Sequence, residues 1–151
     1  MLLAFLACIG KKGTDTHYRV ESPSSYWVEL PPTSADRAWR NAQQESIIYV
    51  KSNCGPYFED RLLQDSLLSL TRGLPIKETV LTEELKIANR KALFQIVDSE
   101  IDGVPFRLGM VVVSKNNCLY DFLYIAPPKF FKEGVADFMN TAQSLQTNLP
   151  Q

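Results

Sequence analysis

The residues of this sequence that could take part in the most kinds of chemistry are its three cysteines, Cys8, Cys54 and Cys118, and its single histidine, His17. Cys54 precedes Gly55-Pro56 near the start of an expected helix, and such a position can lower the pKa of a thiol and make it nucleophilic. A nucleophilic cysteine also needs a base, and His17 is the one histidine in the chain. A Cys-dependent enzyme is therefore one hypothesis, although the sequence indicates no further catalytic group.

An uncharged apolar run, Leu2 to Ala7, directly precedes Cys8, as at the end of a bacterial lipoprotein signal peptide. In that interpretation Cys8 carries the lipid, and the polar stretch from Lys11 to Asp15 is the tether to the domain. The alternative is an apolar first strand or chain end without lipid. We expect residues 1–16 to form a partial signal or lipidation segment and linker, with membrane attachment through Cys8.

Lipidation of Cys8 would leave Cys54 and Cys118 as an even pair in an exported chain, where disulfides form. Cys54 ends one expected strand and Cys118 begins another, so the two thiols could meet at one edge of a sheet. The alternative is two separate buried thiols, since a free cysteine packs as a small hydrophobic residue.

The stretch from Asp98 to Gly103 begins like a calcium-binding loop, but Gly109 occupies the position that needs a bidentate glutamate. We interpret this stretch as a solvated hairpin tip whose acidic side chains point into water. His17 has no second histidine or Cys-x-x-Cys pair with which to bind zinc. Phosphate-binding glycine motifs and a Gly-x-Ser-x-Gly elbow are also missing from the sequence. We therefore expect no metal, no cofactor and no enzymatic activity.

Charge and length narrow the class of protein further. The 16 basic and 17 acidic residues are scattered and give a net charge of -1, which argues against a nucleic-acid partner. No stretch approaches the roughly 20 apolar residues needed to span a bilayer. The 151 residues, 45% of them apolar, suffice for one core, and we expect a single domain over residues 17–148.

The first half of the chain predicts two strands and a helix. Tyr26 to Leu30 is rich in aromatic and β-branched residues and ends at a Pro-Pro pair, which is typical of a strand. Ser46 to Val50 is a continuous β-prone run and predicts a central strand buried on both faces. From Glu59 to Arg72, leucines recur mostly at helical spacing before Gly73, so we expect an amphipathic helix followed by an extended stretch.

The second half predicts three consecutive antiparallel strands and a final helix. The strands are Ala92 to Glu100, Val104 to Ser114 and Cys118 to Ile125, separated by turn residues that readily adopt positive φ. After a Pro-Pro pair, apolar residues from Phe131 to Leu145 fall on one helical stripe that should lie against the sheet. Together, these elements predict an α+β fold in which helices cover an antiparallel β-sheet.

Aromatic residues are the remaining candidates for a contact surface. Tyr120, Phe122 and Tyr124 alternate onto one face of a strand. Burial under a helix would explain this pattern, whereas an open face would form a groove for a peptide or apolar ligand. Trp39 lies among polar residues and is a further candidate for an exposed contact, with a clamp over the core as the alternative.

The order of these elements resembles the PsbP-like group, which includes DcrB-type bacterial lipoproteins and the Mog proteins. The resemblance covers most of residues 17–147 and is carried by the Tyr26 to Leu30 strand, the helix after Ser46 to Val50, the meander ending in Cys118 to Phe122, and the Phe138 to Leu145 helix. It implies an α/β/α sandwich that serves as a binding or assembly module, because members of this group are generally not enzymes.

Three functional hypotheses follow from these observations. The first is a non-enzymatic, lipid-anchored protein on the periplasmic side of a bacterial envelope, acting as a protein-binding or assembly module. The second is a cytoplasmic chaperone-like adaptor of the same fold, which would require Cys8 without lipid. The third is an enzyme that uses Cys54.

Overall fold

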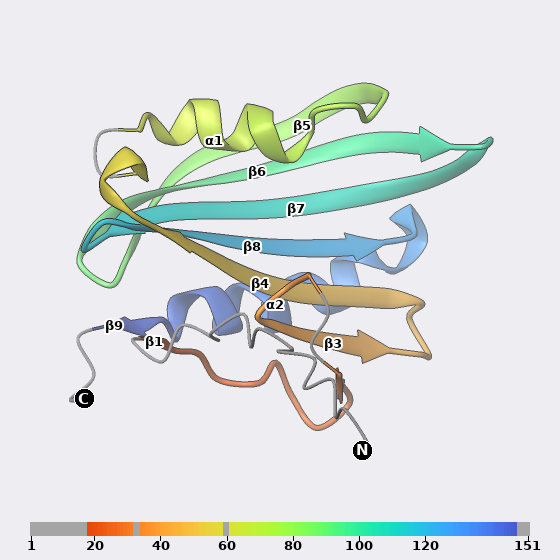
Figure 1. Ribbon diagram of the computed structural model, residues 1–151. Helices are drawn as coiled ribbons and strands as arrows, with labels where there is room; N and C mark the ends of the chain where they lie inside the picture. The colour runs from red at the N-terminus through yellow and green to blue at the C-terminus, as the bar shows by residue number, and fades with distance from the viewer. Residues whose placement is uncertain (1–17, 32–33, 59–60, 148–151) are drawn as a thin grey trace, which may run out of the picture.

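A seven-stranded antiparallel sheet with one helix on each face is the centre of this protein, shown in Figure 1 as a computed structural model. The structure describes residues 18–31, 34–58 and 61–147. The elements in chain order are β1 (Tyr18–Arg19), β2 (Val28–Leu30), β3 (Arg37–Asn41), β4 (Ser46–Cys54), a 3₁₀ turn η1 (Pro56–Phe58), α1 (Leu63–Leu70), β5 (Ile76–Ile87), β6 (Arg90–Ile101), β7 (Val104–Lys115), β8 (Cys118–Ala126), α2 (Pro128–Gln143) and β9 (Gln146–Thr147).

The strand order in the large sheet is β2-β3-β4-β8-β7-β6-β5, and β1 pairs separately with β9. The α+β class and the antiparallel sheet agree with the sequence prediction. Asp102 and Gly103 both have positive φ, as do Asn116 and Asn117, so the expected turns connect β6, β7 and β8. A third such turn, at Ala88 and Asn89, adds β5 as a long edge strand where only an extended stretch was expected.

Two apolar clusters hold the helices to the sheet. On one face α2 packs Phe131 and Phe138 against alternate residues of β7 and β8, including Val111 and Phe122. On the other face α1 packs Leu67 against the intervening residues of the same strands. Each strand contributes to both clusters because successive side chains point to opposite faces.

Two predicted elements differ from the structure, and one strand was not predicted. Helix α1 begins only at Leu63, because Leu62 has an extended backbone. Strand β3, including Trp39, was not expected, because its charged neighbours hide the period-two pattern. Strand β4 is not buried on both faces: Ile48 and Val50 are enclosed, but Ile47 is 37% exposed. The partly exposed face of β4 lines the candidate site described below.

Candidate functional site

The face of the sheet that carries α1 is only partly covered. Helix α1 is short and packs against β6 and β7, whereas α2 on the opposite face packs against β4, β7 and β8. The β3-β4-β8 part of the α1 face is therefore left as a groove of about 500 Å³. Its lining residues are Leu30, Ser34, Ala35, Ala38, Ile47, Tyr49, Lys51, Asn53, Leu70, Asp121, Leu123 and Ile125. We call this surface the open-face groove.

Three cross-strand pairs form the floor of the open-face groove. In the register of β4 and β8, Ile47 faces Ile125, Tyr49 faces Leu123 and Lys51 faces Asp121. Directly opposed side chains on one face of an antiparallel pair lie close enough to pack against one another. The floor therefore changes along its length from aliphatic, through aromatic, to charged.

A second hollow of about 480 Å³ continues the groove past α1. It shares Tyr49, Leu70, Leu123 and Ile125 with the first hollow and extends it to Phe106. The additional lining residues are Arg72, Leu74, Ile101, Phe106 and Leu108. The two hollows thus form one apolar surface with polar groups concentrated at the Asp121 end.

Asp121 is the most unusual residue in the groove. Its side chain belongs to a residue that is only 6% exposed, and its Oδ1 atom has no hydrogen-bond partner among the described residues. Burial raises the pKa of Asp121 to about 6, although the positive charges of Arg61 and Lys51 act to lower it. Near neutral pH the groove therefore contains a buried carboxyl group that is close to its own titration point.

Tyr49 connects the apolar and charged parts of the floor. Burial raises the pKa of its phenol, and the negative charge of Asp121 raises that pKa further. The hydroxyl consequently stays protonated throughout the physiological range and remains a neutral hydrogen-bonding group. Tyr49 and Asp121 both line the open-face groove.

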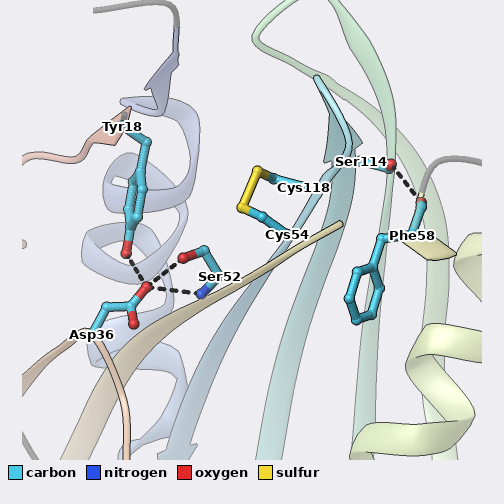
Figure 2. The surroundings of a disulfide bond; sticks show 7 residues. All are labelled: Tyr18, Asp36, Ser52, Cys54, Phe58, Ser114 and Cys118. Carbon is cyan, nitrogen blue, oxygen red and sulfur yellow. Dashed lines mark hydrogen bonds between the residues drawn. A yellow bond between two sulfur atoms is a disulfide. The ribbon is translucent and has the colours of Figure 1, made fainter. Parts of the chain in front are cut away.

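A disulfide closes the same end of the sheet (Figure 2). Cys54 and Cys118 are register partners at the ends of β4 and β8, and their sulfur atoms are 2.06 Å apart. Of the two interpretations left open by the sequence, the structure contains the paired one. The bond adds a covalent tie between the two strands that form the floor of the groove.

Asp36 anchors the chain next to this disulfide, as Figure 2 also shows. Its Oδ2 atom accepts hydrogen bonds from the Tyr18 hydroxyl at 2.7 Å, the Ser52 amide at 2.8 Å and the Ser52 hydroxyl at 2.7 Å. Because all three donors converge on Oδ2, this oxygen is fully engaged within the fold. It ties the N-terminal segment and β3 to β4, and we assign it a structural role.

Solved structures share this arrangement, although no protein-family model and no curated protein sequence matches the chain. CyanoP, the cyanobacterial PsbP of Synechocystis, superposes with a TM-score of 0.58 at 12% identity, over 94% of this chain and 98% of that one. The chain has a PsbP-like fold.

Two other structures have the same fold at similarly low identity. LpqN of Mycobacterium tuberculosis, described as involved in cell envelope biogenesis, has a TM-score of 0.63 at 10% identity, over 87% of this chain and 83% of that one. A protein of Bacteroides thetaiotaomicron has a TM-score of 0.61 at 8% identity over 88% of this chain. The PsbP-like domain described here spans only 48% of that Bacteroides chain.

The aromatic residues considered as a possible contact surface are not exposed in the PsbP-like domain. Trp39, Tyr120, Phe122 and Tyr124 are all buried on the α2 face, so of the two alternatives that the sequence left open the structure has the buried one. Tyr124 stacks with Phe138 at 5.6 Å between ring centres, and α2 covers this row. The ambiguity arose because alternation identifies the residues of one face without indicating whether a helix covers it.

The sequence analysis did not identify the residues of the groove, although the composition of β8 pointed to one of them. Asp121 is the one charged residue in an otherwise apolar or aromatic strand, and it lies on the face opposite Tyr120 and Phe122. A carboxylate within a buried strand is rarely placed there without a partner or a function. Cys8 and His17, the other residues singled out from the sequence, lie outside the described residues.

The acidic hairpin forms as expected, with Asp102 exposed at its tip, but Asp98 is paired with Arg107. Arg107 donates two hydrogen bonds to Asp98, at 2.7 and 2.9 Å, and this interaction holds the pKa of that carboxyl below its usual value. Ser99 is buried and donates to the Pro75 carbonyl. Within the described ranges, no group of three or more His, Cys, Asp or Glu side chains is arranged to hold a metal ion. None of the helices there is long and apolar enough to cross a membrane.

Proposed function

We propose that this PsbP-like domain is a non-enzymatic binding or assembly module of the bacterial cell envelope, tethered on the periplasmic side through a lipid on Cys8. The observation that carries the proposal is the Cys54–Cys118 disulfide. Structural disulfides persist in oxidising compartments such as the periplasm and are rare in the cytoplasm. The bond joins residues 64 positions apart, and closing a loop of that length restricts the unfolded chain and so stabilises the folded domain.

The start of the chain supports the anchored form of this proposal. An apolar run before Cys8, followed by the polar segment from Lys11 to Asp15, has the composition of a lipidation site and its tether. The similarity to LpqN, a protein described as involved in cell envelope biogenesis, agrees with an envelope location. That similarity is one of fold, so the anchor itself depends on the sequence pattern alone.

Binding fits the chemistry of the domain better than catalysis does. The thiol considered as a nucleophile, Cys54, is bonded to Cys118 and therefore cannot form a thiolate while the disulfide is intact. The open-face groove is concave and mostly apolar with a few polar groups at one end, as ligand-binding surfaces commonly are. A cytoplasmic adaptor of the same fold is the rival hypothesis, and it would require both cysteines to be reduced.

Intact mass spectrometry of the protein from its own host, combined with membrane fractionation, tests this proposal. We expect a membrane-associated chain that begins at Cys8, carries added acyl mass and becomes two daltons heavier on reduction, because one disulfide takes up two hydrogens. A soluble cytoplasmic chain with free thiols and no acyl group would contradict the proposal and favour the adaptor. In-host photo-crosslinking from Ile47 and Ala38 in the groove, with exposed Leu68 on α1 as the control position, would then identify the partner.

A further inference from the structure

We propose that the open-face groove binds an extended, uncharged segment of a partner polypeptide, with a backbone N–H of that segment donating a hydrogen bond to the carboxyl group of Asp121. Apolar side chains of the segment lie on the Ile47–Ile125 and Tyr49–Leu123 pairs of the floor. This inference builds on the proposed function, which supplies a protein partner, and it adds where that partner binds and what chemistry is recognised.

The unpaired oxygen of Asp121 is the first argument. Nearly all buried acceptors in folded proteins have a hydrogen-bond partner, because an unsatisfied one loses its interaction with water without replacement. Asp121 lines the groove and is only 6% exposed. Its Oδ1 atom has no hydrogen-bond partner in the part of the chain that is described. Rotation of the terminal carboxyl group would turn this enclosed atom towards the groove, where a ligand that brings a donor would satisfy it.

The charges around Asp121 indicate that the missing donor is neutral. Lys51, directly opposite on β4, and Arg61, before α1, already act on Asp121 as positive charges. A cationic ligand would be repelled by these two groups, whereas the carboxylate of a fatty acid would be repelled by ionised Asp121. An amide N–H avoids both penalties, and a polypeptide backbone supplies such donors at regular intervals.

The shape of the groove favours an extended chain. Its floor is made of three successive cross-strand pairs, and its apolar surface continues beyond Tyr49 towards Phe106. Alternate side chains of an extended peptide point to the same side, so they can rest on successive pairs of this floor. Beside Asp121, Lys51 offers a donor and Asn53 offers both a donor and an acceptor, which complements the carbonyls and amides of a backbone.

Fluorescence anisotropy with a capped, fluorescein-labelled peptide of alternating leucine and serine tests the assignment directly. We expect saturable binding to the full chain, no binding of an all-serine peptide, and weaker binding when the backbone amides are N-methylated. A fluorescent fatty acid is the competing probe. If the fatty acid binds in the groove and the peptide does not, the inference is overturned in favour of an amphiphile.

Variants then test the role of each group. We expect Asp121→Leu to weaken peptide binding about tenfold, the factor that corresponds to one hydrogen bond to a charged acceptor, and to remove most of the N-methylation penalty. Asp121→Asn keeps an oxygen acceptor and should bind better than Asp121→Leu. Ile47→Glu should abolish binding, whereas Leu68→Glu, which changes an exposed leucine of α1 outside the groove lining, should bind like the wild type.

The outcomes separate this inference from the proposed function. Equal N-methylation penalties in the wild type and in Asp121→Leu would overturn the assignment of Asp121 even if the peptide binds. A lipid-anchored, disulfide-bonded protein whose groove fails to bind the peptide would overturn this inference alone. A cytoplasmic, unlipidated protein that binds the peptide through Asp121 would overturn the envelope proposal and leave the groove assignment intact.

Discussion

Asp121 and Lys51 are direct partners across β8 and β4, yet only Lys51 is exposed to water. The two groups do not form an ion pair within 4.0 Å among the described residues, and the carboxyl keeps an unpaired oxygen. A cross-strand pair of opposite charges would ordinarily stabilise a sheet modestly. Here burial outweighs that attraction, because the pKa of Asp121 is raised to about 6 and not lowered.

The raised pKa of Asp121 predicts a loss of stability as pH increases. The folded state holds this proton more tightly than the unfolded state, so stability should fall between about pH 4 and pH 6 as the buried group ionises. Asp121→Asn should remove this dependence, so that its own free energy of unfolding differs little between pH 3.5 and pH 7.5. At pH 7.5 that free energy should exceed the wild-type value by about 3 kcal/mol. Urea denaturation from pH 3.5 to 7.5 measures both curves.

Asp98 is the matched control for this pH experiment, because its pKa is shifted in the opposite direction. Arg107 stabilises the ionised form of Asp98 and lowers its pKa, so Asp98→Asn should lose stability above pH 4 and converge on the wild type in acid. If Asp121→Asn followed the same course as Asp98→Asn, the buried carboxyl group would have to be stabilised in its ionised form.

The Cys54–Cys118 disulfide should contribute substantially to the stability of the domain. The chain-entropy model gives about 4 kcal/mol for closing a loop of this size. We expect reduction to lower the melting temperature of the wild type, and the double variant Cys54→Ser/Cys118→Ser to melt at that lower temperature with or without reductant. An equally stable reduced protein would show that the bond is not structural.

Gly134 on α2 is expected to tolerate no side chain. A Cβ at this position would collide with the hydroxyl of Tyr124, whose ring is held between Phe131 and Phe138. Because the ring cannot swing away, Gly134→Ala should destabilise the domain by about 1–3 kcal/mol. Thermal denaturation of Gly134→Ala, Tyr124→Phe and the double variant checks the cause: the double variant should lose less stability than the sum of the single changes.

Asp36 should be a stability residue without a role in ligand binding. Asp36→Ala removes one acceptor shared by the Tyr18 hydroxyl and two donors of Ser52, so we expect a loss of about 2 kcal/mol. Ser52→Ala removes only one of the three donors and should cost less. Denaturation of both variants gives this ranking, and the leucine–serine peptide should bind both as it binds the wild type.

Local sequence patterns were sufficient to predict the β6-β7-β8 meander. Asp102-Gly103 and Asn116-Asn117 adopt the positive φ values that two-residue hairpins require, and that preference belongs to the residues themselves. The same reasoning failed for β5, because its solvated charges resemble a loop, and for β3, because Trp39 is its one large apolar residue. Both strands are specified by pairing with neighbours as well as by their own composition.

The chain's local chemistry was enough to set the strand alternation, the hairpin turns and the amphipathic stripe of α2, since each depends on residues close in sequence. Which face of β8 would be covered depended on where two helices dock, and docking is decided by packing between distant segments. The Tyr120, Phe122 and Tyr124 face was buried by α2, whereas α1 settled over β6 and β7 and left the Asp121 face open. The candidate site therefore arises from incomplete helix coverage, a property of the folded molecule that periodicity does not encode.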